Sequence, residues 1–153
     1  MIVPLAAGGV TDVVARVLAE RMRGPIGQPI IIENVAGADG SIGAGRAARA
    51  RPDGYTIIIG FLGSHVVNGA YYSLPYDVIN DFAPISLLVR FPVVLCARKT
   101  MPAQNLNELI AWLKANPNQA SAGAFTAALR LLWAFFRKET ATQITLVPYR
   151  GYV

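Results

Sequence analysis

Residues 2–33, IVPLAAGGVTDVVARVLAERMRGPIGQPIIIE, carry the pattern that decides the fold class. A short apolar strand at 2–3 leads through a turn of small residues, 4–9, into a helix. From Thr11 onward the apolar residues recur at the spacing of one helix face, and a Gly-Pro pair ends the pattern. Three isoleucines at 30–32 follow as a strand without polar alternation, which is typical of a parallel sheet covered on both faces. The stretch therefore predicts one strand–helix–strand unit.

The same alternation continues along the rest of the chain. The hydrophobic pattern predicts further strands at 55–60, 85–89, 93–97, 120–123 and 144–147. It predicts further helices at 41–50, 66–71, 105–116 and 126–139, with Asn105 as a cap, and it ends the first helix of the chain at Gly24-Pro25. Alternating strands and helices are joined by crossovers, so we expect an α/β fold with a mostly parallel sheet and flanking helices.

The composition excludes two broad classes of protein. With 54% hydrophobic and 15% charged residues, the 153-residue chain has enough apolar surface to fold and is not intrinsically disordered. The richest apolar run, Ala124–Phe136, has Arg130 near its middle. A membrane-spanning helix needs roughly 18 or more uninterrupted apolar residues, and this run is shorter. We therefore interpret it as a buried core helix.

The charge pattern argues against nucleic-acid binding. Fourteen basic and nine acidic residues give a net charge of +5, but the arginines are scattered and like charges do not form blocks. A mildly positive field of this kind suits a small anionic ligand. We therefore expect no nucleic-acid partner.

Cysteine and histidine usage predicts no metal and no cofactor. Cys96 is the only cysteine, so an intrachain disulfide is impossible, and its apolar neighbours predict a small core residue. His65 is the only histidine, and no cluster of Cys, Asp or Glu stands at ligand spacing around it. Ser64 beside His65 does not make a catalytic triad by adjacency, because nucleophile and base must meet across space. We favour a hydrogen-bonded loop histidine, then a ligand contact, over catalysis.

Glycine-rich loops follow three of the predicted strands, at 5–9, 37–43 and 60–65. Ligands of open α/β sheets bind beyond the carboxyl ends of the strands. The first loop precedes a helix, whose N-terminus carries about half a positive charge and favours a carboxylate. The amides that would bind it belong to Ala7, Gly8 and Gly9. A plain strand-to-helix turn is the alternative interpretation.

Two other segments contain residues that could bind an anion. Gly37-x-x-Gly40-x-x-Gly43 has neither the spacing of a dinucleotide fingerprint nor the Gly-Lys-Ser/Thr ending of a P-loop, so we expect Gly43 to allow close packing of a helix on a strand. Tyr149-Arg150 follows the last predicted strand. An arginine binds a carboxylate through two hydrogen bonds, although a surface arginine is the common alternative.

Eight short segments occur in an order that resembles one protein family. They are Val3–Asp12, Glu33-Asn34 with Gly37–Gly43, Pro52–Thr56, Leu74–Asp77, Asp81–Pro84, Lys114–Pro117, Ser121–Gly123 and Val147–Gly151. The family is the periplasmic receptors of tripartite tricarboxylate transporters, also called Bug proteins. The resemblance covers essentially the whole chain.

The resemblance implies a periplasmic-binding-protein-like fold of type II, in which two lobes close on a small organic acid. It implies a truncated member, with residues 1–97 as the N-terminal part of the first lobe and 98–153 as an incomplete second lobe. A di- or tricarboxylate, or a similar acid, would be captured in the periplasm and passed to the membrane permease subunits of the transporter. The resemblance implies no catalytic residue.

The resemblance also implies a ligand site, in which main-chain amides, small hydroxyls and ordered water hold the carboxylate. The matching positions are Ala7, Gly8, Gly9, Ser64 and His65 in the first lobe, and Gly123, Thr126, Tyr149 and Arg150 in the second. Two positions depart from the family. Ala7 stands where proline is usual. Ala124-Phe125 stands where the family has a glycine or hydroxyl residue followed by a histidine, which leaves Thr126 as the nearby hydroxyl.

Two other functions remain open from the sequence. A small α/β enzyme would use the glycine loops for a nucleotide, or the loop of Ser64 and His65 for hydrolysis. A chain that holds parts of two lobes would otherwise have no function of its own and would expose apolar surface. The amino terminus, Met1-Ile2-Val3-Pro4, has neither the charged region nor the apolar core of a secretion signal, so we expect no such signal in this chain.

Overall fold

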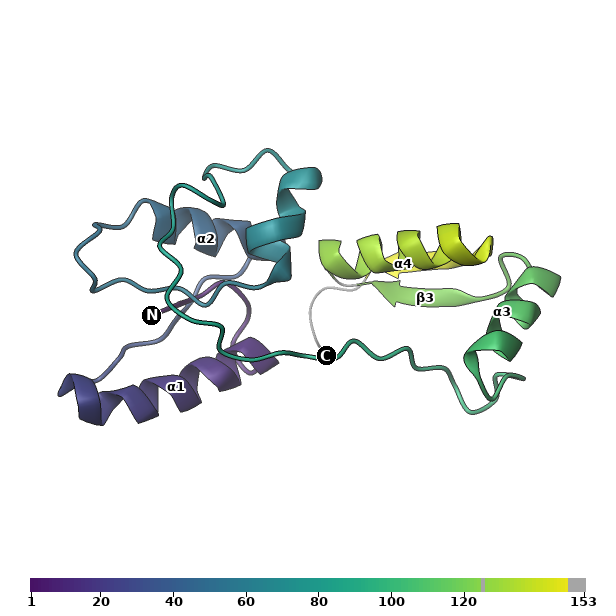
Figure 1. The fold of residues 1–153 in the computed structure, drawn as a ribbon, viewed down its shortest axis with the longest axis horizontal. Coiled ribbons are helices and arrows are strands. Elements are labelled where there is room, and N and C mark those ends of the chain that lie inside the picture. Colours follow the sequence, from purple (N-terminus) through teal and green to yellow (C-terminus); the bar gives the residue numbers. More distant parts are fainter. Residues whose placement is uncertain (125, 149–153) are drawn as a thin grey trace. The chain divides into compact units, whose positions relative to one another are not determined.

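The computed structural model describes residues 1–124 and 126–148 (Figure 1). These residues form two compact units. The first contains Met1–Phe82 together with Thr126–Ala128, and the second contains residues 83–124 and 129–148. The assignment of 1–97 and 98–153 to two lobes of a binding protein stays a prediction.

A parallel arrangement of three segments forms the centre of the first unit. Strand β1, Ile2–Val3, pairs in parallel with β2, Glu33–Asn34, and Ile2 lies opposite Glu33. On its other edge β1 forms a parallel bridge with Ile58. The Ile2 N–H donates to the carbonyl oxygen of Ile57 at 2.8 Å. β1 is therefore hydrogen-bonded on both edges, and the parallel sheet expected from the sequence is confirmed here.

The strands of this unit are shorter than predicted. The isoleucines at 30–32 lie outside β2, which begins at Glu33, and of residues 55–60 only Ile58 forms a bridge. These strands are short because their shared partner, β1, has two residues, and a strand extends only as far as a neighbouring backbone can form hydrogen bonds with it. Before Ile2, the Met1 ammonium group donates to the Ile31 carbonyl oxygen at 2.7 Å.

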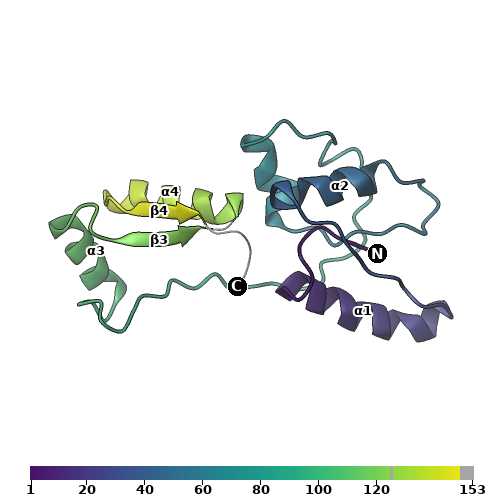
Figure 2. The same cartoon turned by 180° about the vertical axis from the view of Figure 1, so that it is seen from behind.

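Two helices cover the strands from opposite sides, as Figures 1 and 2 show. Helix α1 is Val10–Ile26 and helix α2 is Ser41–Ala48. The core below α1 consists of Val3, Ala15 and Ile59, with Met1 and Ile32 packed against it.

The end of α1 differs from the prediction, because the helix continues through Gly24-Pro25. It ends at Gly27, whose φ of 73° is left-handed and whose N–H donates to the carbonyl oxygens of Arg23 and Gly24. Proline removes one amide donor, but its fixed φ is helical, so a proline in the last turn is a weaker stop than a left-handed glycine.

Close packing of α2 on the first strand depends on Gly43, as predicted. A Cβ atom at Gly43 would lie 2.7 Å from the Pro4 Cβ and 2.7 Å from the Val35 carbonyl oxygen. Real Cβ atoms essentially never come so close. The glycine therefore sets the distance between helix and strand.

Short helical turns make up much of the rest of the first unit. They are η1, Ala38–Gly40, η2, Gly63–Val67, and η3, Asn68–Ala70. The helical stretch predicted at 66–71 thus begins at Gly63, and η2 is a single wide turn of the π type.

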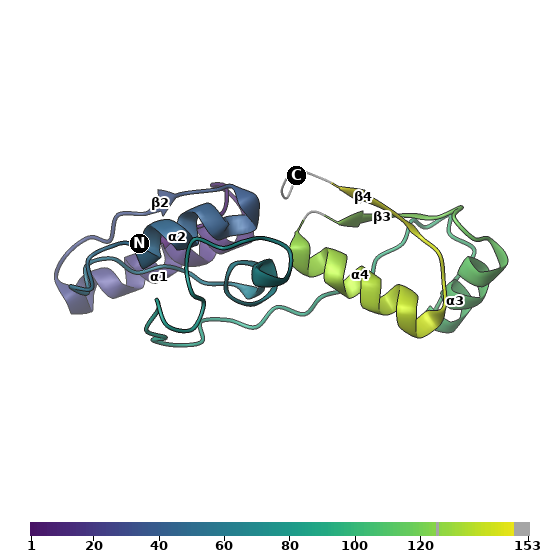
Figure 3. The same cartoon turned by 90° about the horizontal axis from the view of Figure 1, so that it is seen from above.

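The second unit contains a parallel strand pair with two helices. Strand β3, Ser121–Ala124, pairs with β4, Thr145–Pro148, so that Ser121 lies opposite Thr145. Both strands lie within one residue of their predicted positions. Helix α4, Ala127–Thr140, connects them and runs along the strand pair (Figures 2 and 3). Helix α3, Leu106–Ala115, precedes β3. The core consists of Leu113, Ala122 and Ile144, with Trp133 and Phe136 of α4 packed against it.

Helix α4 is not the buried core helix that we expected. Leu132 is 41% exposed and Phe135 is 56% exposed. The helix contributes one face to the core, and the opposite face remains open to solvent. No helix in the described part of the chain is long and apolar enough to cross a membrane.

The strands predicted at 85–89 and 93–97 are wrong, because residues 83–98 form neither helix nor strand. Ile85 is 83% exposed and Val94 is 70% exposed. Cys96 is also exposed, so its prediction as a core residue is wrong as well. The sequence pattern suits strands, but a strand needs a neighbouring backbone, and none of the described segments pairs with this one.

Candidate functional site

Three loops of the first unit begin at the same edge of its sheet. Because β1, β2 and the segment at Ile58 run in parallel, the chain leaves each of them on the same side. Contacts join the three loops beyond that edge. A Cβ atom on Gly40 would lie 2.8 Å from the Phe61 ring and 3.2 Å from the Pro4 carbonyl oxygen. The loops predicted at 5–9, 37–43 and 60–65 therefore come together.

Asp12 organises the first of these loops from the first turn of α1. Its side chain is only 3% exposed. Oδ2 accepts hydrogen bonds from the Gly8 N–H at 2.9 Å and from Arg16 Nε at 3.0 Å, and Oδ1 accepts one from Asn34 Nδ2 at 3.0 Å. Arg16, the Gly8 amide and Asn34 hold the pKa of Asp12 at about 2, below its ordinary value of 3.8.

The role of Asp12 was missed by the sequence analysis, although a signal for it was present. Gly9 is the N-cap of α1, so Asp12 stands at the third helical position, where a carboxylate reaches back to a free amide before the helix. Its partner Asn34 lies 22 residues further along the chain, and no local sequence pattern predicts that contact.

The three amides predicted at this loop have different partners. The Gly8 N–H is bound to Asp12, and Gly8 has a left-handed φ of 84°. Within residues 1–124 and 126–148, no acceptor lies within hydrogen-bonding distance of the amides of Ala7 or Gly9. Ala7 is exposed, and Gly9 is partly exposed. The Asp12 carboxylate therefore holds the loop through Gly8, and the amides of Ala7 and Gly9 remain available as donors.

Ser64 and His65 lie in η2, beyond the third segment of the sheet. The Ser64 side chain is fully buried, and its Oγ lies 2.8 Å from His65 Nδ1. The Tyr76 hydroxyl donates to the Ser64 carbonyl oxygen at 2.6 Å, and the His65 ring lies 4.6 Å from the ring of Phe82. Burial lowers the pKa of His65, so the imidazole is neutral at pH 7. The expected hydrogen-bonded histidine is confirmed.

This pair does not have the geometry of a hydrolase. A nucleophile must meet its substrate, and Ser64 presents no surface. A base needs a third group to orient it, and none of the carboxylates in the described ranges forms a hydrogen bond with His65. The described residues also contain no group of three or more His, Cys, Asp or Glu side chains that would hold a metal ion.

The candidates predicted for the second lobe are only partly described. Gly123 lies in β3, and its carbonyl oxygen accepts a hydrogen bond from Trp133 Nε1 at 3.3 Å. Thr126 is buried. Tyr149 and Arg150 lie outside the described residues.

Comparison with known proteins identifies the family. The family described as "Tripartite tricarboxylate transporter family receptor" matches residues 14–153. The chain belongs to this family. The resemblance found in the sequence is thereby confirmed.

Curated relatives of this receptor chain are about twice as long. It is 37% identical to the "UPF0065 protein in the TAR-I ttuE-ttuC' intergenic region" of Agrobacterium vitis, over 99% of this chain and 44% of the relative. It is 36% identical to "Protein BugT" of Bordetella pertussis, over 99% of this chain and 48% of the relative. The chain therefore spans about half the length of the curated relatives it matches.

Solved structures confirm the fold class of the receptor chain. "R. palustris Rpa4515 with adipate" matches 98% of this chain and 52% of its own, with a TM-score of 0.88 and 34% identity. "MatC (Rpa3494) from Rhodopseudomonas palustris with bound malate" covers the same shares, with a TM-score of 0.84 and 36% identity. The periplasmic binding protein BugD matches with a TM-score of 0.83 and 36% identity. The α/β fold is thus that of periplasmic binding proteins, and this chain corresponds to about half of such a protein.

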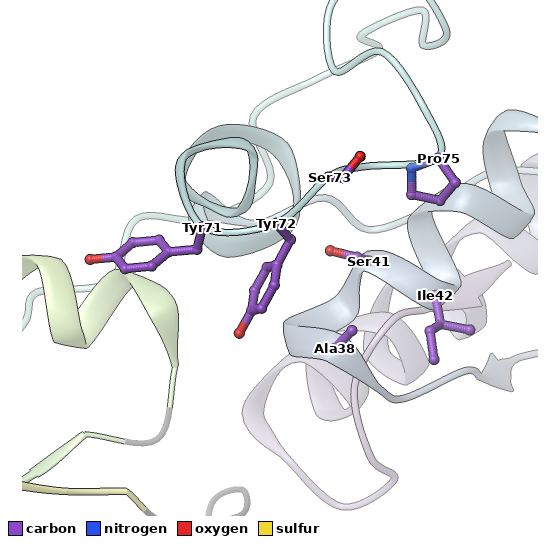
Figure 4. Close-up of a pocket in the computed structure, with 7 residues that line it drawn as sticks. All are labelled: Ala38, Ser41, Ile42, Tyr71, Tyr72, Ser73 and Pro75. Carbon is purple, nitrogen blue, oxygen red and sulfur yellow. The ribbon is translucent and has the colours of Figure 1, made fainter.

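One cavity of the receptor chain was not found by sequence reasoning. It lies in the first unit, has a volume of about 430 Å³, and is lined by Ala38, Ser41, Ile42, Tyr71, Tyr72, Ser73 and Pro75. Figure 4 shows the Ser41 hydroxyl and the Tyr72 ring on its wall. The Tyr72 hydroxyl donates to Asp39 Oδ2 at 3.5 Å. The lining comes from two segments about 30 residues apart, and no local motif connects them.

Proposed function

We propose that this chain contains the N-terminal part of the first, carboxylate-binding lobe of a tripartite tricarboxylate transporter receptor, together with an incomplete second lobe. Its ligand would be a small organic acid, captured in the periplasm for the permease subunits of the transporter. The observation that supports this proposal most directly is that loops 5–9, 37–43 and 60–65 meet at one edge of a parallel sheet. The adipate and malate in related structures support a dicarboxylate as the ligand class.

The geometry of the first loop suits a carboxylate. The amides of Ala7 and Gly9 precede α1, where the helix dipole adds partial positive charge. Gly8 cannot contribute in the same way, because its N–H is bound to Asp12. Its hydrogen bond instead fixes the loop before the ligand arrives, which reduces the entropy lost on binding.

The charge of Asp12 would oppose an anion nearby if it stood alone. Arg16 Nε lies 3.0 Å from its Oδ2 and offsets that charge. Arg16 is itself more than half exposed, so the pair is partly screened by water. The net field at the loop is then set by the helix N-terminus and the amides.

Ser64 and His65 would have different roles in this site. Ser64 is fully buried and cannot touch a ligand, whereas His65 is partly exposed. Ser64 therefore orients the imidazole through the 2.8 Å contact with Nδ1, and His65 makes the ligand contact. Neither residue is assigned a catalytic role. Gly123, Thr126, Tyr149 and Arg150 are proposed as the contribution of the second lobe.

Titration of the ¹⁵N-labelled chain with adipate and malate would test this function, because NMR detects weak binding. We expect amide shifts at Ala7, Gly9 and His65, and none with the uncharged diamide of adipate. If the acids and the diamide behave alike, or if the shifts lie elsewhere, the carboxylate site is wrong.

A pair of substitutions at Gly9 isolates the amide. Gly9 has φ −75° and ψ 169°, which both alanine and proline adopt. Gly9→Ala keeps the N–H and should bind adipate like the unaltered chain. Gly9→Pro removes the N–H and should weaken binding at least tenfold, roughly the effect of one charge-assisted hydrogen bond. Equal binding by both variants would show that this amide does not hold the acid.

A further inference from the structure

Four consecutive residues between β2 and α2 have positive φ angles. The φ values are 131° at Gly37, 45° at Ala38, 50° at Asp39 and 88° at Gly40. Glycine adopts such angles freely and aspartate moderately well, but alanine is strained there. Within the turn the Gly40 N–H donates to the Gly37 carbonyl oxygen at 2.9 Å. One backbone hydrogen bond is weak support for two non-glycine residues in this region, so hydrogen bonds to groups outside the turn also contribute, such as that from the Ala127 N–H to Asp39 Oδ2 at 2.9 Å.

The side chain of Asn68 reaches this turn from η3. Its Nδ2 donates to the Asp39 carbonyl oxygen at 2.9 Å and to Ser41 Oγ at 2.9 Å, and lies 3.5 Å from the Ala38 carbonyl oxygen. Asn68 is fully buried. The main-chain carbonyl oxygen of Asn68 accepts hydrogen bonds from the main-chain amides of Tyr71 and Tyr72. The donor is therefore anchored in one segment and bound to another about 30 residues earlier.

The amide orientation of Asn68 follows from its partners. Carbonyl oxygens only accept hydrogen bonds, so the atom that faces Ala38 and Asp39 must be the nitrogen. The opposite atom, Oδ1, is buried and has no hydrogen-bond partner among the described residues. An unpaired buried acceptor is destabilising, and an apolar side chain would avoid it. The stabilising contribution of this side chain therefore comes from its donors to the turn.

The turn is part of the second loop of the candidate site and lies close to the other two. Gly40 packs against the Phe61 ring of the third loop and against the carbonyl oxygen of Pro4, the residue directly before the first loop. Ala38 within the turn and Ser41 directly after it line the 430 Å³ cavity of Figure 4. A change in the conformation of the turn would therefore alter the positions of loops 5–9 and 60–65 and of the cavity wall.

We propose that Asn68 is a positioning residue, which holds residues 37–40 in their left-handed turn and thereby fixes loops 5–9 and 60–65 for ligand binding. Its effect on ligand rests on the proposed carboxylate function. Its effect on the turn does not, so the two can fail separately.

Hydrogen exchange tests the turn without ligand. Asn68→Leu fills the same space but lacks the donors. We expect exchange of the Gly40 amide to become about tenfold faster, roughly the loss of one or two hydrogen bonds. The Ile59 amide, which donates to the Ile2 carbonyl oxygen at 3.1 Å, reports on the sheet and should change little. Unchanged Gly40 exchange, or equal acceleration at Ile59, would overturn the proposal.

A second substitution separates positioning from simple packing. Ala38→Gly relieves the strain at a φ of 45°. In that background Asn68→Leu should accelerate Gly40 exchange clearly less than it does in the unaltered chain. A packing role for Asn68 predicts the same acceleration in both backgrounds, and that result would refute the turn mechanism.

The unaltered chain offers a test that does not depend on the folding of a variant. The side-chain amide protons of Asn68 should exchange far more slowly than those of Asn107, which is exposed on α3. They should also show cross-relaxation to Ser41. Equally fast exchange at Asn68 and Asn107 would exclude the hydrogen bonds on which the proposal depends.

Adipate titration tests the effect of Asn68 on ligand binding. Asn68→Leu should raise at least fivefold the adipate concentration needed to shift the Gly9 amide, and Ala38→Gly should restore part of the loss. Lost protection at Gly40 with an unchanged adipate titration would overturn the positioning role. Absence of any adipate response in the unaltered chain would instead refute the proposed function, and the exchange data would then decide on the turn alone.

Discussion

At the scale of single residues, Asp12 couples the stability of the first unit to pH. Its pKa is about 2 in the folded chain and 3.8 ordinarily, so the folded state binds its proton less readily than the unfolded state. The stabilisation is fully present above about pH 4 and is lost as the pH falls through 2. Asp12→Asn should lower the free energy of unfolding by about 1–3 kcal/mol at pH 7, because buried donors lose their anionic partner.

Urea unfolding at several pH values checks this prediction. The difference between the unaltered chain and Asp12→Asn should shrink between pH 4 and pH 2. Asp53→Asn is the matched control, because among the described residues Asp53 accepts a single, exposed hydrogen bond, from the Tyr55 amide. A constant difference across this range would show that the charge of Asp12 is not what stabilises the loop.

Two glycines provide a second test at this scale. Gly43→Ala would place a methyl group 2.7 Å from Pro4 and from the Val35 carbonyl oxygen, and overpacking of this kind costs about 1–3 kcal/mol. Gly24→Ala meets no atom within 4 Å and lies within α1, so it should be neutral or stabilising by up to about 1 kcal/mol. Thermal unfolding of both variants measures this contrast. Equal effects would mean that α2 moves away from the strand without cost.

The residues that sequence reasoning found and missed differ in where their partners lie. Gly43 and His65 were interpreted correctly, because helix packing and a contact with the adjacent Ser64 are local features. Asp12 and Asn68 were missed as organisers of the site. Asn34, which binds Asp12, and the partners of Asn68 lie 22 to 30 residues away, and only the fold brings them together. The ligand roles of the predicted site residues stay predictions.

At the scale of elements, the start of α3 is a cap of three interlocking hydrogen bonds. Asn105 Oδ1 accepts from the Glu108 N–H at 3.0 Å, Asn105 Nδ2 donates to Glu108 Oε1 at 2.7 Å, and the Gln104 N–H donates to Glu108 Oε2 at 2.8 Å. Asn105→Ala should destabilise the second unit by about 1 kcal/mol. Asn107→Ala, an exposed position within α3, should be neutral or slightly stabilising. Circular dichroism during thermal unfolding distinguishes them, and equal curves would contradict the cap.

The sequence predicted elements well where their partners are present. β3 and β4 lie within one residue of expectation because they pair with each other. The strands at 85–89 and 93–97 failed although their composition favours strands. Composition reports the preference of a segment, whereas a strand forms only when another backbone supplies its hydrogen bonds. The same limit shortened the predicted strand at 55–60 to a single bridge.

At the scale of the whole molecule, the exposed segment 83–98 has a chemical consequence. Cys96 lies in it with apolar neighbours that are also exposed, such as Val94 and Leu95. We expect Cys96 to react with a thiol reagent such as Ellman's reagent at the rate of a free peptide cysteine, without denaturant. Reaction rates in buffer and in urea measure this. A thiol that reacts only after unfolding would mean that the segment is covered in solution.

The position of β1 between two other segments makes it the shared partner on which the sheet of the first unit depends. Ile2 exchanges backbone hydrogen bonds with Ile57 and Ile59, more than fifty residues later in the sequence. Without Ile2 and Val3, β2 and the Ile58 segment would have no common neighbour. Proteolytic cleavage directly after β1 should therefore disrupt this sheet more thoroughly than cleavage in the loop after Ile58.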